Sequence, residues 1–239
     1  LEVHNAAVLG LIFEKINGYK EGAIFTPGYV TMYMARKVIE KTVLEAFQKE
    51  NPSWTLTDTD DLRNNISDDR SKSATLRHNA VIDNLKICDP AVGSGHFLVS
   101  CLNELIALKS RLGILADADG NRLSDYVVEV DNDELIIVNA DTDEVFAYQV
   151  HGTQVPKRLQ QVQQTLFHEK QKLIENCLFG VDINATHTRS ATQGLVTGTC
   201  VPIHVGRSMT VHEIVVTDDQ GRRLSTIRIT NLIKDMPAS

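Results

Sequence analysis

The 239-residue sequence predicts an α/β fold up to about residue 184 and antiparallel β strands after it. Residues 85–112 read as a short apolar strand, a turn with two glycines and an amphipathic helix, which is how an α/β unit opens. Residues 177–184 read as a second buried strand that ends in an acidic residue. Residues 194–233 hold three β-rich runs separated by turn residues. These observations predict two segments of different architecture.

The elements before the glycine turn are predicted to be helices joined by a polar region. Apolar residues recur at helical spacing over residues 6–16, and Asn17-Gly18 stops the run. A second helix is expected over residues 28–48, because the preceding Thr26-Pro27 ends a loop. Residues 50–77 are rich in Asp, Asn and Ser, which predicts a linker or loop with room for one short helix.

The elements after the turn are an insertion, a helix and the final strands. Residues 120–150 contain β-branched runs separated by Asp-Asn-Asp and Asn-Ala-Asp-Thr-Asp, which predicts a β hairpin or small meander inserted into the α/β alternation. A long polar helix is expected over residues 156–176. The β-rich runs cover residues 194–203, 208–219 and 222–233.

Composition places a domain boundary near residue 184. All thirteen aromatic residues precede it. Residues 185–239 carry six Lys/Arg against four Asp/Glu, a net charge of +2, whereas the first part carries 18 against 27, a net charge of −9. We therefore expect two domains, residues 1–184 and 185–239.

Composition also excludes several classes of protein. The net charge of −7 argues against binding nucleic acid by bulk electrostatics. The four cysteines are scattered without a CxxC pair, so we expect neither a metal site nor a disulfide framework. No apolar run approaches the roughly 18 residues of a membrane span, and the first residues lack the features of a secretory signal. A cytoplasmic location is expected.

The glycine turn, Asp89-Pro90-Ala91-Val92-Gly93-Ser94-Gly95, has the chemistry of a ligand site. Its glycines allow positive φ and close approach of a ligand to the backbone, and the helix that follows offers N–H groups. Asp89 at the strand end can accept hydrogen bonds from an ammonium group, and Asp182 after the second strand can receive a ribose diol. Without further motifs, a glycine turn of this kind is as often purely structural as it is part of a ligand site.

The motifs around this turn resemble those of N6-adenine DNA methyltransferases of restriction-modification systems. GAIFTPGYVTMYMARKVI is similar to their F-TP segment, DPAVGSGHFLVSCLNELI to their DPA-GSG motif, and ENCLFGVDIN to the motif with the ribose acid. The resemblance covers about residues 1–184. It implies an incomplete Rossmann-like half that binds S-adenosylmethionine.

The resemblance also assigns cofactor roles to individual residues. It implies that Asp89 and Gly93 hold the methionine part, that Gly95 permits close approach, and that Ala91 lies in the same motif. The remaining implied contacts are the cap formed by Thr26 and Pro27, the ribose acid Asp182, and Ile183 beside the adenine.

One part of the methyltransferase pattern is missing. Adenine N6 is a poor nucleophile. Members of the family carry an Asn/Asp-Pro-Pro-Tyr/Phe tetrad that accepts the protons of the adenine amino group and stacks on the flipped base. The sequence contains no such tetrad, and its nearest string, Asn51-Pro52-Ser53-Trp54, precedes the cofactor turn. The target recognition domain is absent as well. We therefore expect S-adenosylmethionine binding without DNA methylation by this chain alone, with catalytic residues unknown and DNA held in the parent enzyme by segments absent here.

The segment after residue 184 resembles a different family, the hotdog-fold acyl-CoA thioesterases of the kind found in enterobactin biosynthesis. The resemblance lies in NATHTR, GLVTGTCVPIHVGR and EIVVTDDQGRR and covers about residues 184–233. It implies antiparallel strands of hotdog type, with His187 near the thioester and His204, Gly206 and Arg207 near coenzyme A. Thr188 stands where the family often has a second His, and the family's catalytic acid lies in a region that this chain has replaced.

The two resemblances leave three functions open. The first is the S-adenosylmethionine-binding part of an adenine-specific DNA methyltransferase. The second is acyl-CoA thioester hydrolysis by a hotdog domain, and the third is a non-catalytic chimera joined near residues 182–187. Three strands without a covering helix expose a face and an edge, so we expect a homo-oligomer through the C-terminal strands and no membrane association.

Overall fold

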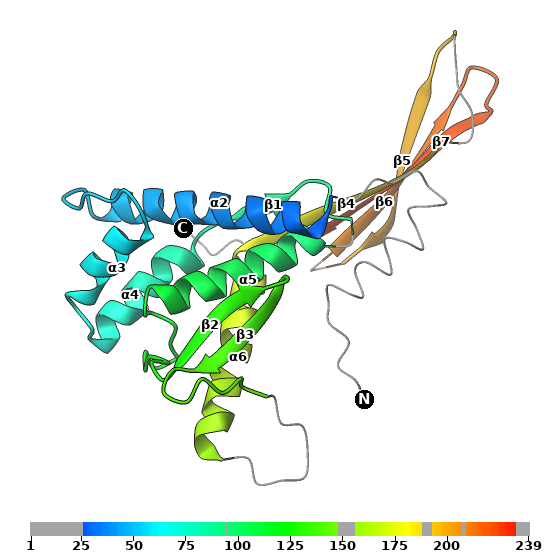
Figure 1. The fold of residues 1–239 in the computed structure, drawn as a ribbon. Coiled ribbons are helices and arrows are strands. Elements are labelled where there is room, and N and C mark those ends of the chain that lie inside the picture. Colours follow the sequence, from blue (N-terminus) through cyan, green and yellow to red (C-terminus); the bar gives the residue numbers. More distant parts are fainter. Residues whose placement is uncertain (1–25, 94, 148–155, 188–192, 207–208, 233–239) are drawn as a thin grey trace. The chain divides into compact units, whose positions relative to one another are not determined.

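The computed structural model describes residues 26–93, 95–147, 156–187, 193–206 and 209–232 (Figure 1). Residues 182–187 and 231–232 are described as strand backbone only. The helix predicted over residues 6–16 lies outside the described residues, as does Arg207. The chain divides into two compact units. The first holds Thr26–Ile87 and Val99–Leu178, and the second holds Cys88–Leu98 and the chain from Phe179 onward.

The first unit begins with three helices, and here the structure differs from the predicted linker. Helix α2 (Gly28–Glu50) matches the expectation, but α3 (Thr59–Ser67) and α4 (Lys72–Asp83) occupy much of residues 50–77. The Asp58 carboxylate accepts from two backbone N–H groups at the start of α3, and the Ser71 hydroxyl accepts from one at the start of α4. Two of the residues that suggest a linker, Asp58 and Ser71, are therefore helix caps.

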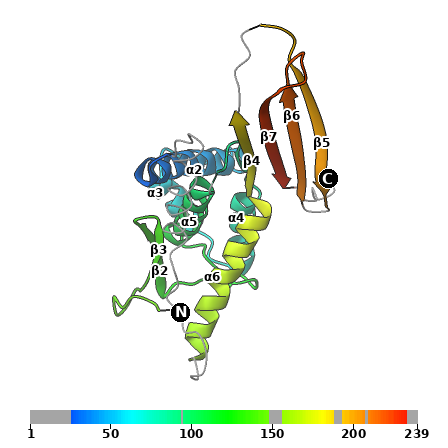
Figure 2. The same cartoon turned by 90° about the vertical axis from the view of Figure 1, so that its right-hand side faces the viewer.

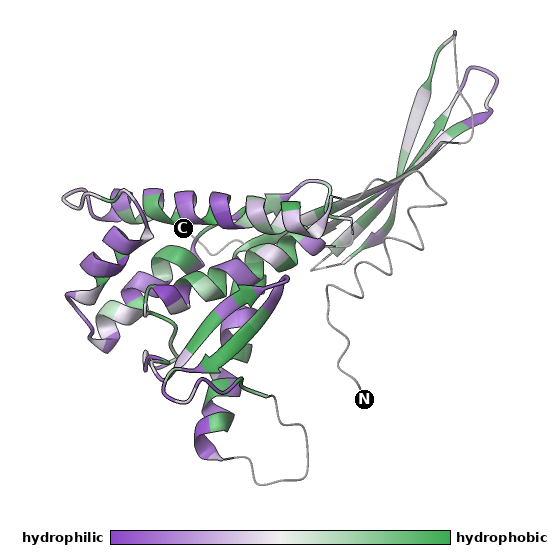
Figure 3. Cartoon of the chain, in the orientation of Figure 1, coloured by the Kyte–Doolittle hydropathy of each residue, from purple (hydrophilic) through white to green (hydrophobic). Residues whose placement is uncertain are grey.

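The rest of the first unit follows the predicted order closely. Helix α5 (His96–Arg111) precedes the strands β2 (Tyr126–Asp131) and β3 (Glu134–Asn139), and α6 (Lys157–Asn176) follows them. The strands pair as an antiparallel hairpin. Its two turn residues, Asn132 and Asp133, have φ of 47° and 64°, which a tight hairpin turn requires and Asn and Asp tolerate. Figure 3 shows both strands as largely hydrophobic.

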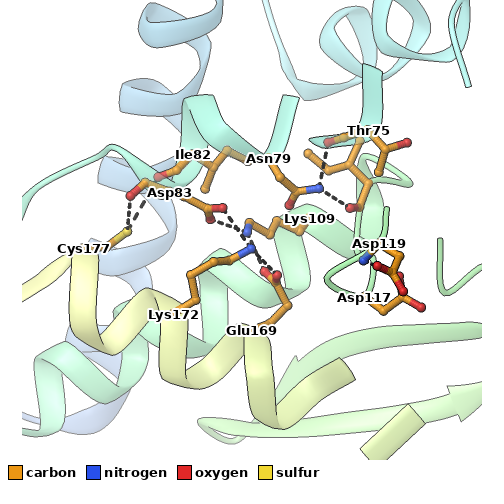
Figure 4. Close-up of polar contacts among 11 residues, drawn as sticks. Thr75, Asn79, Ile82, Asp83, Lys109, Asp117, Asp119, Glu169, Lys172 and Cys177 are labelled. Atoms are coloured by element: carbon orange, nitrogen blue, oxygen red, sulfur yellow. Dashed lines mark hydrogen bonds and ion pairs between the residues drawn. The ribbon is translucent and has the colours of Figure 1, made fainter. Parts of the chain in front are cut away.

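A cluster of four charged side chains, two buried and two half-buried, joins three helices of this unit (Figure 4). Lys109 of α5 has no exposed side-chain surface, and its Nζ lies 2.5 Å from both Asp83 Oδ1 of α4 and Glu169 Oε2 of α6. Lys172 Nζ lies 3.0 Å from Asp83 Oδ2 and 2.5 Å from Glu169 Oε1. Burial opposes the charged form of Lys172, but its hydrogen bond to Glu169 and the nearby carboxylates hold its pKa above the usual value.

The second unit is organised around a five-stranded sheet of order β1-β4-β7-β6-β5. Figure 2 shows the order β4, β7, β6 and β5. Its strands are β1 (Ile87–Asp89), β4 (Leu178–His187), β5 (Thr197–Val205), β6 (Met209–Thr217) and β7 (Arg223–Leu232). Strands β4 to β7 pair antiparallel, which confirms the antiparallel character of the C-terminal segment. The Rossmann-like half stays a prediction.

Strand β4 continues without a break through residue 184, the predicted boundary. Two hydrogen bonds connect the segment around β1 to the first part of β4: the Ile87 N–H donates to the Cys177 carbonyl at 2.8 Å, and the Val92 N–H donates to the Val181 carbonyl at 2.9 Å. The residue numbers rise together on both sides, so the two segments run parallel. From Val181 to His187 the same strand pairs antiparallel with β7. Strand β4 therefore pairs both with the segment around β1, before residue 184, and with β7, after it.

Candidate functional site

The glycine turn follows β1 directly and uses the backbone freedom of its two glycines. Gly93 has φ of 50° and Gly95 has φ of 82°, a region that side-chain-bearing residues rarely adopt. Asp89 at the end of β1 is half-buried, and its Oδ1 accepts from the Ala91 N–H at 3.0 Å. The Gly95 N–H donates to the Val92 carbonyl at 2.8 Å. Helix α5 starts at the next residue, where the first N–H groups of a helix lack partners within the helix.

The turn packs closely on β4 at a glycine that the sequence motif does not single out. A Cβ added to Gly180 would lie 2.8 Å from Val92 Cγ2 and 3.2 Å from Leu98 Cδ1. Real Cβ atoms essentially never come that close, so only glycine lets the turn sit at this distance from the strand. The signal in the sequence is the Gly-Val-Asp string of ENCLFGVDIN, in which Gly180 stands two residues before the ribose acid.

The predicted cofactor residues are distributed over both units. Asp182 and Ile183 follow Val181, whose carbonyl accepts from the turn, and their backbones pair with Thr230 and Ile229 of β7. Ala91 and Gly93 are exposed in the turn. Thr26 and Pro27 belong to the first unit, where the Pro27 carbonyl accepts from the first turn of α2. The structure therefore brings the turn and the backbone before Asp182 together, and describes Thr26 and Pro27 within their own unit.

The described residues of the alternative coenzyme A site lie at two places on the sheet. His187 ends β4 opposite Ser225, and His204 lies near the end of β5 opposite Val211. Two strands separate β4 from β5, which sets them about 14 Å apart at the usual strand spacing. Gly206 is tightly placed, because an added Cβ would lie 2.7 Å from His204 Nε2. His204 and Gly206 thus form one local corner, and His187 lies elsewhere.

Two side chains of the first unit, Glu104 and His78, are among the described residues with shifted pKa values. Burial raises the pKa of Glu104, although the Arg111 guanidinium opposes the shift. Burial lowers the pKa of His78, and nearby arginines add to the effect. No group of three or more His, Cys, Asp or Glu side chains that could hold a metal occurs among the described residues. Within the same residues, no helix is long and apolar enough to cross a membrane.

A cavity of about 240 Å³ opens between the loop after α5 and helix α6. It is lined by Asp117, Ala118, Asp119, Gln161, Gln164, Thr165 and His168. The Asp117 carboxylate already accepts from backbone and side-chain N–H groups of Asn121 and from the Asp119 N–H. Burial opposes its charged form, but these hydrogen bonds hold the pKa of Asp117 below the usual value. The carboxylate is thus engaged in closing its own loop.

The two ends of the chain are similar to different protein families. A model of the thioesterase superfamily matches residues 150–225. The N-terminal region is similar to a Methanocaldococcus jannaschii protein whose name describes a type II restriction enzyme and methyltransferase, with 38% identity over 121 residues. That match covers 45% of this chain and 10% of the relative. The predicted resemblance to a restriction-modification methyltransferase is thereby confirmed for the N-terminal region.

The C-terminal region is similar to thioesterases. The proofreading thioesterase EntH of Cronobacter sakazakii is 46% identical over 57 residues, which cover 24% of this chain and 42% of that protein. A thioesterase structure from Haemophilus influenzae aligns with a TM-score of 0.21 and 33% identity, over 23% of this chain and 41% of that one. The chain therefore spans about a tenth of the restriction enzyme relative and about two fifths of the thioesterase relative.

Proposed function

We propose that the first part of the chain is the S-adenosylmethionine-binding part of an N6-adenine DNA methyltransferase, and that the turn from Asp89 to Gly95 holds the cofactor against β4. The observation that carries the proposal is the turn itself, with positive φ at Gly93 and Gly95 and close packing at Gly180. The turn lies between Asp89, whose carboxylate can accept from an ammonium group, and the start of α5, whose first N–H groups suit a carboxylate, and these are the two charged groups of the methionine part of the cofactor.

The space around the turn supports this proposal. A Cβ added to Gly95 would meet no atom within 4 Å, so the glycine is not required by packing. Asp89 Oδ1 accepts a hydrogen bond from the Ala91 N–H. The second carboxylate oxygen can accept a hydrogen bond from an ammonium group. Asp182, two residues after the packed glycine, supplies the acid for the ribose.

Methyl transfer to DNA is not part of the proposed function of this chain alone. The sequence lacks the Asn/Asp-Pro-Pro-Tyr/Phe tetrad that would accept the adenine amino protons and stack on the flipped base. In the parent enzyme, DNA would be held by segments beyond those present here. The matched share of the restriction enzyme relative, one tenth, agrees with a partial unit.

Acyl-CoA hydrolysis is the second candidate, favoured by the thioesterase-superfamily match over residues 150–225 and the EntH similarity. His187, implied near the thioester, and His204, implied near coenzyme A, lie on strands that two other strands separate, so a site of this kind would have to extend across the sheet. If neither activity is present, the chain is a non-catalytic chimera in which β4 pairs with both segments.

The test is binding of labelled S-adenosylmethionine and of labelled acetyl-CoA to the full chain in equilibrium dialysis. We expect saturable binding of S-adenosylmethionine that falls at least tenfold in Asp89→Ala. Asp141→Ala, which removes an exposed aspartate in the turn after β3, should bind as the parent chain does. Binding of acetyl-CoA alone would support the thioesterase alternative, and binding of neither would leave the chimera. Methylation of adenine by the purified chain would refute the claim of inactivity.

A further inference from the structure

The cavity between the loop after α5 and helix α6 is lined by negative charge. Its described lining contains two aspartates, Asp117 and Asp119, and no lysine or arginine. Lys157 and Arg158, the basic residues at the start of α6, line an adjoining cavity instead. Arg158 is also paired, because its guanidinium donates to both carboxylate oxygens of Asp125. The cavity at the loop therefore favours a positively charged group over an anion.

The two aspartates of the loop differ in what their carboxylates already bind. Asp117 accepts from the Asn121 side chain at both oxygens and from Gln161 Nε2 at 3.3 Å, so its charge is fixed in place. Gln161 is itself oriented, since its Oε1 accepts from Arg158 at 2.8 Å. Asp119 is exposed, and among the described residues its carboxylate has no partner. One available carboxylate suits an ammonium group better than a calcium ion, which needs roughly six to eight oxygen ligands.

One face of α6 supplies neutral hydrogen-bonding groups to the same cavity. Gln164, Thr165 and His168 line it together with Gln161, at the spacing i, i+3, i+4 and i+7 of a single helix face. Within the part of the chain that the structure describes, the first three of these side chains have no hydrogen-bond partner. Thr165 is the informative one, because it is only 3% exposed and yet lines the cavity. A buried hydroxyl without a partner is unfavourable, so a ligand that reaches Thr165 gains a hydrogen bond there.

We propose that this cavity binds a small polyhydroxylated amine of the size of an amino sugar, with its ammonium group at Asp119 and its hydroxyls at Gln164, Thr165 and His168. The volume of about 240 Å³ lies below the roughly 300–1,000 Å³ of pockets for drug-sized ligands, which limits the ligand to about one sugar ring. Amide, hydroxyl and neutral imidazole groups can each donate and accept, as sugar hydroxyls require. The loop and α6 both belong to the first unit, so this site is independent of the proposed cofactor site.

The test is a titration of the full chain with glucosamine, followed by the backbone amide chemical shifts in two-dimensional NMR spectra. N-acetylglucosamine is the matched ligand, because it keeps the ring hydroxyls and lacks the charged amine. At about 0.15 M salt, charges more than about 8 Å apart are largely screened, which suppresses general attraction to an acidic chain. We expect saturable shifts in residues 117–121 and 161–168, and binding of glucosamine at least tenfold tighter than that of N-acetylglucosamine. Saturable shifts only elsewhere, no saturable shifts, or equal affinity for the two sugars would overturn the proposal.

Two pairs of variants test the individual contacts. Asp119→Asn should weaken glucosamine binding at least tenfold, whereas Asp141→Asn, which removes an exposed carboxylate outside the cavity, should bind as the parent chain does. Thr165→Val should weaken binding at least threefold, whereas Thr165→Ser, which keeps the hydroxyl, should not. Equal losses within either pair would contradict the contact that the pair tests.

Discussion

The buried charge cluster around Lys109 predicts a large loss of stability when that one ammonium group is removed. Lys109 and Lys172 balance the carboxylates of Asp83 and Glu169. In Lys109→Met, the two carboxylates would share Lys172 alone, and the Glu169 side chain, 2% exposed, could not regain water. Removing one partner of a buried ion pair costs about 3–5 kcal/mol, and we expect a loss of that size in the free energy of unfolding.

The assay is urea unfolding of the full chain followed by the fluorescence of Trp54, the only tryptophan. Its ring stacks on Phe47 in the first unit at 6.4 Å between centroids, so it reports on the unit that contains the cluster. Lys41→Met is the matched control. It breaks an exposed pair in which Lys41 Nζ lies 3.9 Å from Glu45 Oε1, and it should cost at most about 0.5 kcal/mol.

A double variant separates charge balance from lost packing. Lys109→Met combined with Glu169→Gln leaves one ammonium and one carboxylate, so it should be more stable than Lys109→Met alone. The reasoning would be refuted if Lys109→Met were as mild as Lys41→Met. It would also fail if the double variant lost the sum of both single effects.

Three further predictions concern other sites. Burial lowers the pKa of His78, so protonation favours the unfolded chain; its contribution is complete above the unfolded value of 6.5 and is lost as pH falls from there to the folded pKa. Urea midpoints between pH 8 and 5 should fall less in His78→Phe than in the parent chain. Gly180→Ala should displace Val92 and cost about 1–3 kcal/mol, seen as faster amide exchange in β1 and β4, and unchanged exchange would contradict the close packing. Asp58→Ala should remove the N-cap of α3 at about 1 kcal/mol in the urea assay, whereas Asp60→Asn should not if capping is the cause.

Local patterns predicted much of the fold. The Asp-Asn-Asp string predicted the hairpin between β2 and β3 because its residues tolerate positive φ, and the structure places Asn132 and Asp133 there. The glycine turn was found for a similar reason, since Gly93 and Gly95 adopt φ values that other residues avoid. The sequence predicted α2, α5 and α6 within a few residues of their observed ends, α2 from the preceding Thr26-Pro27 and α5 from its place directly after the glycine turn.

The features that sequence reasoning missed depend on partners distant in the chain. Lys109 looks like a solvated charge at the end of a helix, and only its contacts with Asp83 and Glu169, 26 and 60 residues away, make it a core residue. Helix α3 buries only Leu62 and Ile66, so its polar sequence suggested a linker. Position 180 requires glycine because of Val92, which is 88 residues away in the sequence and lies against it in the fold.

Calorimetric titration of S-adenosylmethionine into Gly95→Ala and Gly113→Ala tests the cofactor site most directly. Both glycines have positive φ, 82° and 68°, and an added Cβ at either would meet no atom within 4 Å. Both substitutions therefore cost about 1–2 kcal/mol of backbone strain, and only Gly95 lies in the proposed site. We predict saturable heat for the parent chain and Gly113→Ala, and at least tenfold weaker binding in Gly95→Ala. No saturable heat in the parent chain, or equal affinity in the two variants, would contradict the proposed site.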